Sequence, residues 1–356
     1  MVIDGSFNRN GGLTLVPMPG FEDLALSLKE GIEAKGKKDN EVDTPVDIVI
    51  PSFGFHANRE PDIKLGKDHV GGHDCVVLTS GPGTYEMTGQ LIYAVGYLAG
   101  RKPSRISIAS GYFPLGRTDK DEGTDIFALP PIFYRALEGV SQGLLSRIVC
   151  ADPHCDQIVM AGPTGRVTPV YLTRRLLVHM LGEARCHSDR VCLAFPDDTA
   201  SKRFKPAIAM VEQELGIELR TVVAAQRRTS SRNKNVAYVI GDTDALAGSI
   251  VIALDDETAT GTSQINAAVR FKQEYGAKQV WAAVTHGVLC EDGPERFADP
   301  ACAIDRLYIT DTIPFANRPE LQALFASGRL HTISWVDDLV WIIYHLHWDR
   351  QIRGVR

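Results

Sequence analysis

Short apolar runs rich in valine and isoleucine recur along the chain, and longer stretches with helical spacing separate them. Runs of this kind are typical of strands buried on both faces of a sheet. The runs expected to form strands are Val46–Pro51, Cys75–Ser80, Ile106–Tyr112, Arg147–Ala151, Val191–Phe195, Ile250–Leu254, Val280–Val284 and Leu307–Thr310. The stretches expected to form helices are Glu22–Ala34, Tyr85–Ala99, Val170–Met180, Pro206–Leu215 and Thr262–Tyr275.

The alternation of strand and helix predicts an α/β fold with parallel sheets and right-handed crossovers. The length of 356 residues suggests two domains or one domain in two halves. Because strands and helices recur along the whole chain, we expect two similar halves, each a parallel sheet flanked by helices. The N-terminal half is expected over residues 1–168 and the C-terminal half over 169–356, and helices near the boundary are free to cross over.

Acidic residues follow three of the predicted strands. They are Asp152-Pro153-His154, Asp197-Asp198 and Asp255-Asp256-Glu257. In open α/β sheets ligands bind outside the carboxyl ends of the strands. The sequence therefore predicts an active site at the strand ends around Asp152, Asp197 and Asp255.

The composition excludes several other classes of protein. A formal charge of -6 argues against a general binder of nucleic acid or anionic membranes. The 7 cysteines are scattered without a C-x-x-C pair, so we expect reduced thiols in the cytoplasm rather than disulfides or a zinc site. The first residues lack a cationic flank before an apolar stretch, and no apolar run reaches the roughly 18 residues that span a bilayer, so we expect no targeting or membrane segment.

The stretch from Ile250 to Tyr275 carries the most specific chemistry. It combines a buried strand, the carboxylates of Asp255 and Asp256, a loop of threonine and glycine, and a helix. Free N–H groups and hydroxyls at a helix N-terminus bind phosphate, and adjacent carboxylates accept hydrogen bonds from ribose hydroxyls or hold Mg²⁺ through water. The alternative is that the carboxylates solvate a strand end and Thr260 or Thr262 caps the helix.

Several motifs decide between these interpretations. Residues Leu254–Ser263 read L-D-D-E-T-A-T-G-T-S, which resembles the loop V-D-D-x-x-D-T-G-G-T of ribose-phosphate pyrophosphokinases. Ile240–Asp242, Ala283–Val288 and Thr310–Pro314 resemble the family's I-G-D, A-T-H-G-V and T-D-T-I-P in the same order. Weaker likenesses cover His56–Glu60, Tyr112–Lys120, Asp152–Gln157 and Phe195–Asp197, so the resemblance extends from about residue 13 to about 340.

The resemblance implies two phosphoribosyltransferase-like halves and an enzyme that transfers diphosphate from MgATP to the anomeric hydroxyl of a ribose 5-phosphate compound. It implies an ATP site at Asn58, Glu60, Arg117, Asp119 and His154. Asn58 and Glu60 would come from a neighbouring subunit, which predicts a homo-oligomer, a dimer or a hexamer. It implies a ribose-phosphate site at Asp255, Asp256, Thr258, Thr260, Gly261, Thr262 and Ser263. Mg²⁺ would be held by His154 and Asp197, and the catalytic residues would be Arg227, Arg228 and His154.

The chain departs from the family's pattern close to these sites. Ala259 replaces the third aspartate of the loop, and Thr262-Ser263 replaces G-T. Gln226 replaces the lysine of a K-R-R motif, and Arg59 replaces a glycine. These changes leave open an acceptor such as ADP-ribose and a non-catalytic regulatory relative. An ordinary phosphoribosyltransferase shares the loop and the fold but needs no ATP site, and the two-half length and the Arg117 and Glu60 regions speak against it. Retention of the acidic strand ends favours activity, because crowded carboxylates lower stability.

Overall fold

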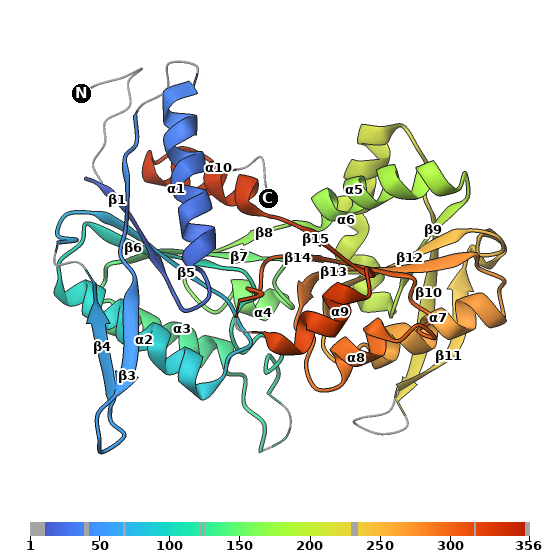
Figure 1. Cartoon of the computed structure of the whole chain (residues 1–356), viewed down its shortest axis with the longest axis horizontal. Coiled ribbons are helices and arrows are strands. Elements are labelled where there is room, and N and C mark those ends of the chain that lie inside the picture. The colour runs from blue at the N-terminus through green and yellow to red at the C-terminus, as the bar shows by residue number, and fades with distance from the viewer. Residues whose placement is uncertain are drawn as a thin grey trace. The chain divides into compact units, whose positions relative to one another are not determined.

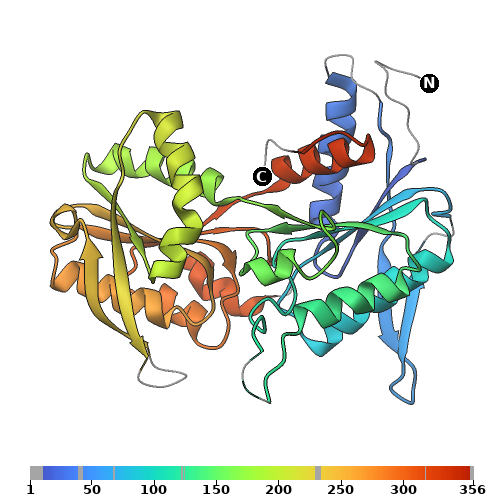
Figure 2. The same ribbon diagram turned by 180° about the vertical axis from the view of Figure 1, so that it is seen from behind.

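The chain folds into two compact units. The computed structural model describes residues 11–38, 43–66, 69–121, 123, 125–228, 234–316 and 318–352, without the side chains of 199, 225–228 and 234–237. The first unit comprises Met1–Val170, Thr312–Ala316 and Ser334–Arg356, and the second comprises Tyr171–Asp311 and Asn317–Ile333. Figures 1 and 2 show the two sheets of these units from opposite sides.

The first unit is built on a six-stranded parallel sheet in the order β2-β1-β5-β6-β7-β8. Its strands are β1 Leu13–Pro17, β2 Val46–Ile48, β5 Asp74–Thr79, β6 Arg105–Ser110, β7 Leu145–Ala151 and β8 Val167–Val170. Its helices are α1 Glu22–Lys37, α2 Tyr85–Gly100, α3 Pro130–Val140, α4 Asp156–Val159 and α10 Val336–His347. In Figure 1, α1 and α10 cover one face of this sheet, and α2 and α3 cover the other.

The second unit contains a seven-stranded sheet in the order β11-β10-β9-β12-β13-β14-β15. Its strands are β9 Val191–Phe195, β10 Arg220–Arg228, β11 Lys234–Gly241, β12 Ile250–Thr258, β13 Gln279–Gly287, β14 Arg306–Thr310 and β15 Leu330–Ile333. Its helices are α5 Thr173–His187, α6 Asp198–Leu215, α7 Thr262–Gln273, α8 Gly293–Ala298 and α9 Gln322–Ala326, with 3-10 turns η2 Thr243–Ala245 and η3 Pro319–Leu321. Helices α5 and α6 lie on one face and α7 on the other (Figure 1).

The predicted α/β class with two parallel-sheet halves is confirmed, and its physical basis is visible in the packing. Helix α2 buries Leu91, Val95 and Leu98, which share one face at helical spacing, in the core of the first unit. In the second unit, strands β9 and β12 are apolar on both faces because helices cover both sides of the sheet.

Two antiparallel pairs depart from the predicted parallel pattern. Strands β3 (Pro51–Phe55) and β4 (Pro61–Leu65) form a two-stranded hairpin, and β10 pairs antiparallel with β11 at the edge of the larger sheet. Neither pair contains a helix-length connection, so a short link returns the chain in the opposite direction. The helix expected over Val170–Met180 begins at Thr173 instead, because β8 first pairs with β7.

A buried polar network ties the C-terminal helix to the first unit. Asp74 at the start of β5 is 2% exposed, and its Oδ2 accepts hydrogen bonds from Arg105 Nη2 at 2.7 Å and from His347 Nδ1 at 3.0 Å. Arg105 Nη1 also donates to Asp349 Oδ1 at 2.7 Å. These partners hold the pKa of Asp74 below its usual value, although burial alone would raise it.

Among the described helices, none has the length and apolar character needed to cross a membrane.

Candidate active site

The seven-stranded sheet has a point where its connections diverge. Strand β9 leads through α6 to β10 on one side, while its neighbour β12 leads through α7 to β13 on the other side. Such a switch point opens a crevice at the carboxyl ends of the two strands, and ligands of open α/β sheets bind there. Asp197 lies just beyond β9, and Asp255 and Asp256 lie in the last part of β12. The second unit thus brings these three predicted residues to one place.

Asp255 and Asp256 lie within a strand rather than after it, which corrects the sequence prediction. Strand β12 continues to Thr258 because β13 continues beside it, pairing Asp255 with Val284 and Thr258 with Gly287. Successive side chains of a strand point to opposite faces. Asp255 accordingly meets Gln264 of α7, and Asp256 meets Arg203 of α6 on the other face.

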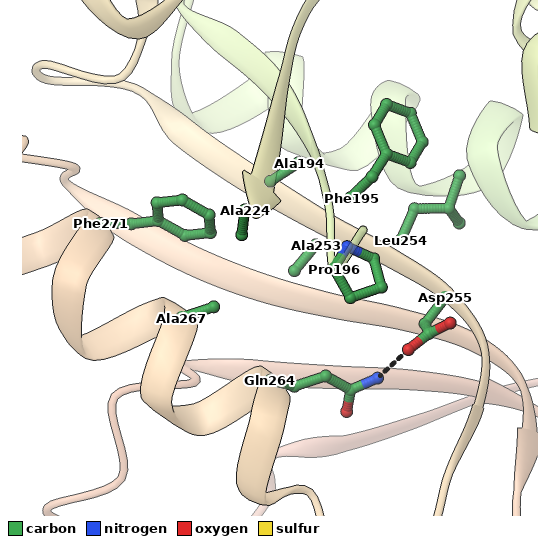
Figure 3. Close-up of a pocket in the computed structure, with 10 residues that line it drawn as sticks. All are labelled: Ala194, Phe195, Pro196, Ala224, Ala253, Leu254, Asp255, Gln264, Ala267 and Phe271. Carbon is green, nitrogen blue, oxygen red and sulfur yellow. Dashed lines mark hydrogen bonds between the residues drawn. The ribbon is translucent and has the colours of Figure 1, made fainter. Parts of the chain in front are cut away.

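Asp255 sits in an unfavourable place for a charge. Its Oδ1 accepts the backbone N–H of Asp256 at 2.9 Å, and Gln264 Nε2 lies 3.5 Å from its Oδ2, as Figure 3 shows. Burial, followed by the negative charges of Asp256 and Asp197, raises the pKa of Asp255 well above its usual range. A strongly shifted carboxyl at a strand end is typical of a functional group rather than a structural one.

Asp256 has a different environment from its neighbour. Its Oδ1 lies 2.8 Å from Arg203 Nη1, and the two side chains are 5% and 25% exposed. A nearby guanidinium favours the ionised carboxylate. The two adjacent aspartates are therefore not equivalent, since only Asp256 is matched by a cation within hydrogen-bonding distance among the described residues.

Asp197 performs a structural task at the start of α6. Its Oδ1 accepts the backbone N–H of Ala200 at 2.8 Å, so it is the N-cap of that helix. This cap fixes the carboxylate at the end of β9. Its predicted role as a metal ligand stays a prediction.

The loop after β12 exposes a helix N-terminus. Gly261 has φ of 69° and is the N-cap of α7, a left-handed position that glycine adopts without strain. Within the described residues no side chain caps this helix, so the alternative that Thr260 or Thr262 caps it is wrong. Instead, Thr260 Oγ1 and Thr262 Oγ1 lie 3.0 Å apart. The first N–H groups of α7, beside Ser263, are thus open to an anion.

A small pocket lies beside Asp255, between the sheet and α7 (Figure 3). Its walls are mostly apolar. The lining residues are Ala194, Phe195, Pro196, Ala224, Ala253, Leu254, Asp255, Gln264, Ala267 and Phe271. Asp255 and Gln264 form the polar end of the pocket (Figure 3).

The first unit brings together the residues predicted to contact ATP phosphates. A Cβ added at Gly116 would lie 3.6 Å from His154 Cβ, so the turn carrying Arg117 and Asp119 packs against the segment after β7. Arg117 is exposed, whereas Asp119 and His154 are half-buried. Cys155, which the sequence prediction did not single out, interacts with Asp119, and burial followed by that carboxylate raises the pKa of its thiol to about 11.

The remaining predicted residues belong to the β3–β4 hairpin and to β10. Asn58 and Glu60 are exposed at the tip of the β3–β4 hairpin, where Asn58 Oδ1 accepts the backbone N–H of Glu60 at 3.2 Å. Arg59 between them has φ of 70°, a left-handed conformation that accounts for the glycine in the motif it resembles. The backbone of Arg227 and Arg228 belongs to β10, but their side chains lie outside the described residues.

Three polar residues of the second unit were missed by sequence reasoning. Arg203 and Gln264 contact the two aspartates, and Arg296 of α8 donates to Thr262. Arg203 lies six residues beyond Asp197, in the helix that follows β9, and this was the one available signal. Gln264 and Arg296 carried none, because their contacts depend on how α7 and α8 pack.

Comparisons with known proteins agree with this arrangement. Residues 199–336 match the family model of the phosphoribosyl synthetase-associated domain. The chain is 30% identical over 270 residues to a ribose-phosphate pyrophosphokinase of Corynebacterium glutamicum, covering 72% of this chain and 75% of the relative. It is 26% identical over 270 residues to the enzyme of that name from Thermosipho africanus, covering 75% and 79%.

The fold is similar to a solved structure over nearly its whole length. Phosphoribosylpyrophosphate synthetase from Mycobacterium smegmatis superposes with a TM-score of 0.74 at 22% identity, covering 95% of this chain and 99% of that one. At this identity the likeness supports the fold alone. The sequence match to the Corynebacterium relative covers most of both proteins, and the chain therefore belongs to the ribose-phosphate pyrophosphokinase family.

Proposed function

We propose that the protein transfers diphosphate from MgATP to the anomeric hydroxyl of a ribose 5-phosphate compound. The anomeric oxygen attacks the β-phosphorus of ATP, and the bond from that phosphorus to the oxygen bridging to the α-phosphorus breaks. AMP leaves with the bridging oxygen, and the anomeric proton passes to solvent. The observation that carries the proposal is the half-buried Asp255, whose pKa is raised, next to an uncapped helix N-terminus at a sheet switch point.

The acceptor site is proposed to lie at β12 and the start of α7. Asp255 and Asp256 would accept hydrogen bonds from ribose hydroxyls. The phosphate would lie on the N–H groups and hydroxyls of Thr258, Thr260, Gly261, Thr262 and Ser263. This assignment is supported by the open N-terminus of α7 and by the 3.0 Å contact between the hydroxyls of Thr260 and Thr262.

The donor site is proposed to involve the first unit. Arg117, Asp119 and His154 would contact the phosphates of ATP, and their packing around Gly116 supports that grouping. Asn58 and Glu60 would contact adenine in a neighbouring subunit of a homo-oligomer, which their exposure at a hairpin tip supports. Arg227 and Arg228 would stabilise the transferring group, because cations placed on a phosphoryl group stabilise its transition state.

The carboxylates at the strand ends of the second unit are suitable ligands for a magnesium ion. Asp197 and the aspartates of β12 are oxygen ligands of the kind that Mg²⁺ prefers, and their mutual repulsion, which raises the pKa of Asp255, is relieved by a cation. His154 was also predicted as a ligand, although imidazole suits transition metals better. When bound with ATP, Mg²⁺ neutralises charge on the triphosphate. Asp197, held rigid by its cap on α6, would position it.

ADP-ribose is a second candidate acceptor, and the altered loop favours it. Its 5-phosphate carries a further AMP group, which needs a recast and accessible phosphate loop. Ala259 removes a carboxylate from that loop, and Thr262 adds a side chain. Both residues are partly exposed, so an extension beyond the phosphate would not have to enter the core.

The deciding experiment follows AMP release by chromatography after incubation with MgATP and either ribose 5-phosphate or ADP-ribose. AMP formed with one of them only identifies the acceptor. The Asp255→Asn variant tests the acceptor site: it should lose turnover at low acceptor concentration while its circular dichroism spectrum is retained. No AMP with either compound would refute the proposed activity and favour a regulatory, non-catalytic member of the family.

A further inference from the structure

Helix α8 and the turn before it contact the phosphate loop, which we define as Thr258–Ser263 between β12 and the start of α7. The backbone N–H groups of Leu289 and Cys290 donate to the carbonyls of Thr258 and Ala259, at 2.9 and 3.2 Å. A Cβ added at Gly293 would lie 2.5 Å from the Ala259 carbonyl oxygen, so the first residue of α8 touches the loop backbone directly. The shape of the loop is therefore set by α8 and the turn before it, as well as by α7.

Arg296 on this helix reaches the start of α7. Its Nη1 donates to Thr262 Oγ1 at 2.6 Å. Its Nε and Nη2 both lie 2.8 Å from Asp292 Oδ2, one turn earlier, and the side chain is 42% exposed. The rigid guanidinium fork is therefore anchored on one edge by Asp292 while its other edge points at the loop.

The contact with Arg296 determines how the loop hydroxyls donate. A guanidinium has no acceptor, so Thr262 Oγ1 must accept the hydrogen bond. Thr262 and Thr260 then share a single hydrogen bond at 3.0 Å, although they have two hydroxyl protons. One proton of the pair thus remains available for an anion, next to the open N–H groups of α7 and to a positive charge.

We infer that Arg296 is a positioning and specificity residue for the phosphate of the acceptor, acting through the hydroxyl of Thr262. The inference rests on the proposed function, because it assigns the phosphate of that acceptor to this loop. Thr262 stands where the family's loop has glycine, and a glycine there could not accept from Arg296. The departure thus replaces a close backbone approach by a hydroxyl oriented by a cation.

The test measures dissociation constants of ribose 5-phosphate and ADP-ribose by titration calorimetry on the full chain. Arg296→Met and Thr262→Val should each weaken binding of the phosphorylated acceptor about tenfold, as expected for one charge-assisted hydrogen bond. The dissociation constant of the double variant should be no higher than that of the single variant that binds more weakly, because both changes remove the same contact. Arg296→Lys should recover part of the loss, since it keeps a charge but not the fork.

Arg270→Met is the matched control. Arg270 also pairs with a carboxylate four residues away on its own helix, at 2.6 Å from Glu274, but it lies two turns from the loop. It should leave the dissociation constant unchanged. A thermal midpoint of Arg296→Met equal to that of the wild type, together with the binding loss, separates positioning from a fold defect.

The outcomes separate this inference from the proposed function. Wild-type binding combined with unchanged affinity in Arg296→Met, or with equal loss in Arg270→Met, overturns the role of Arg296 alone. No wild-type binding of either compound overturns the inference and the proposed acceptor together. A tenfold loss that is confined to the Arg296 and Thr262 variants supports the inference.

Discussion

Arg203 is the residue whose replacement tests the asymmetry of the two aspartates most directly. Arg203→Met keeps the length of the side chain but removes the cation 2.8 Å from Asp256. Asp256 is 5% exposed, so its carboxylate would be left almost buried and without that partner. We expect lower stability of the second unit and weaker binding of the ribosyl compound, because both depend on a correctly placed Asp256.

The exposure of the Arg203–Asp256 ion pair determines how much unfolding free energy Arg203→Met should lose. Removing one partner of a buried ion pair costs about 3–5 kcal/mol, whereas an exposed pair contributes about 0–1 kcal/mol. Since Arg203 is 25% exposed, we place the loss of unfolding free energy at about 2–3 kcal/mol. Lys202→Met is the matched control on the same helix, because Lys202 and Asp198 are 75% and 73% exposed, and it should cost at most about 0.5 kcal/mol.

The assay is urea unfolding of the ligand-free chain, followed by tryptophan fluorescence, for the two single variants and for Arg203→Met combined with Asp256→Asn. The fluorescence reports on the second unit through the fully buried Trp281, and on the first unit through Trp335, Trp341 and Trp348. The combined variant should regain stability relative to Arg203→Met, because the charge of Asp256 is removed together with its partner. Equal losses for Arg203→Met and Lys202→Met, or a combined variant as unstable as the sum of its parts, would refute the reasoning.

Two further predictions concern carboxyls whose pKa values move in opposite directions. The pKa of Asp255 is raised in the folded chain, so the folded state loses stability relative to the unfolded state as pH rises above the ordinary pKa of an aspartate. Asp255→Asn removes this penalty and should raise the thermal midpoint at pH 7. In a series of melts at different pH, the gain should vanish near pH 3, where the carboxyl is protonated in both states. The pKa of Asp74 is lowered, so its ionised form stabilises the fold above the ordinary pKa of an aspartate and this contribution is lost in acid. Asp74→Asn should therefore cost about 3 kcal/mol at pH 7 in urea unfolding. Asp62→Asn, which removes only a pair with the exposed Lys64, should cost at most about 1 kcal/mol.

The fold class was predictable because parallel strands that are buried on both faces appear in the sequence as continuous apolar runs. Val191–Phe195 was predicted with its observed bounds, since helices cover both of its faces. The hairpin of β3 and β4 was missed because only one of its ten residues, Pro51, is fully buried, and a largely exposed ribbon leaves no apolar run. Strand β15 was missed for a similar reason, as a short edge strand with one buried residue, Ile333.

The candidate site was predictable as a place but not as a geometry. Acidic residues after apolar runs located the strand ends, because ligands of parallel sheets bind there. The sequence could not show that β12 continues through Asp255 and Asp256, since that depends on pairing with β13. It also could not supply Arg296, which lies 34 residues from Thr262 and meets it only because α8 folds back on the loop.

Because Asp255 and Asp256 lie inside β12, the two side chains have different partners. Had both followed the strand in a loop, either could have turned to the same ligand. Within the strand, the alternation of side chains sends Asp256 toward α6 and Arg203, and Asp255 toward α7 and Gln264. The right-handed crossovers that place α6 and α7 on opposite faces therefore also decide which carboxyl is matched by a cation. The unmatched one, Asp255, stands at the pocket, where a ligand that donates hydrogen bonds favours its ionised form.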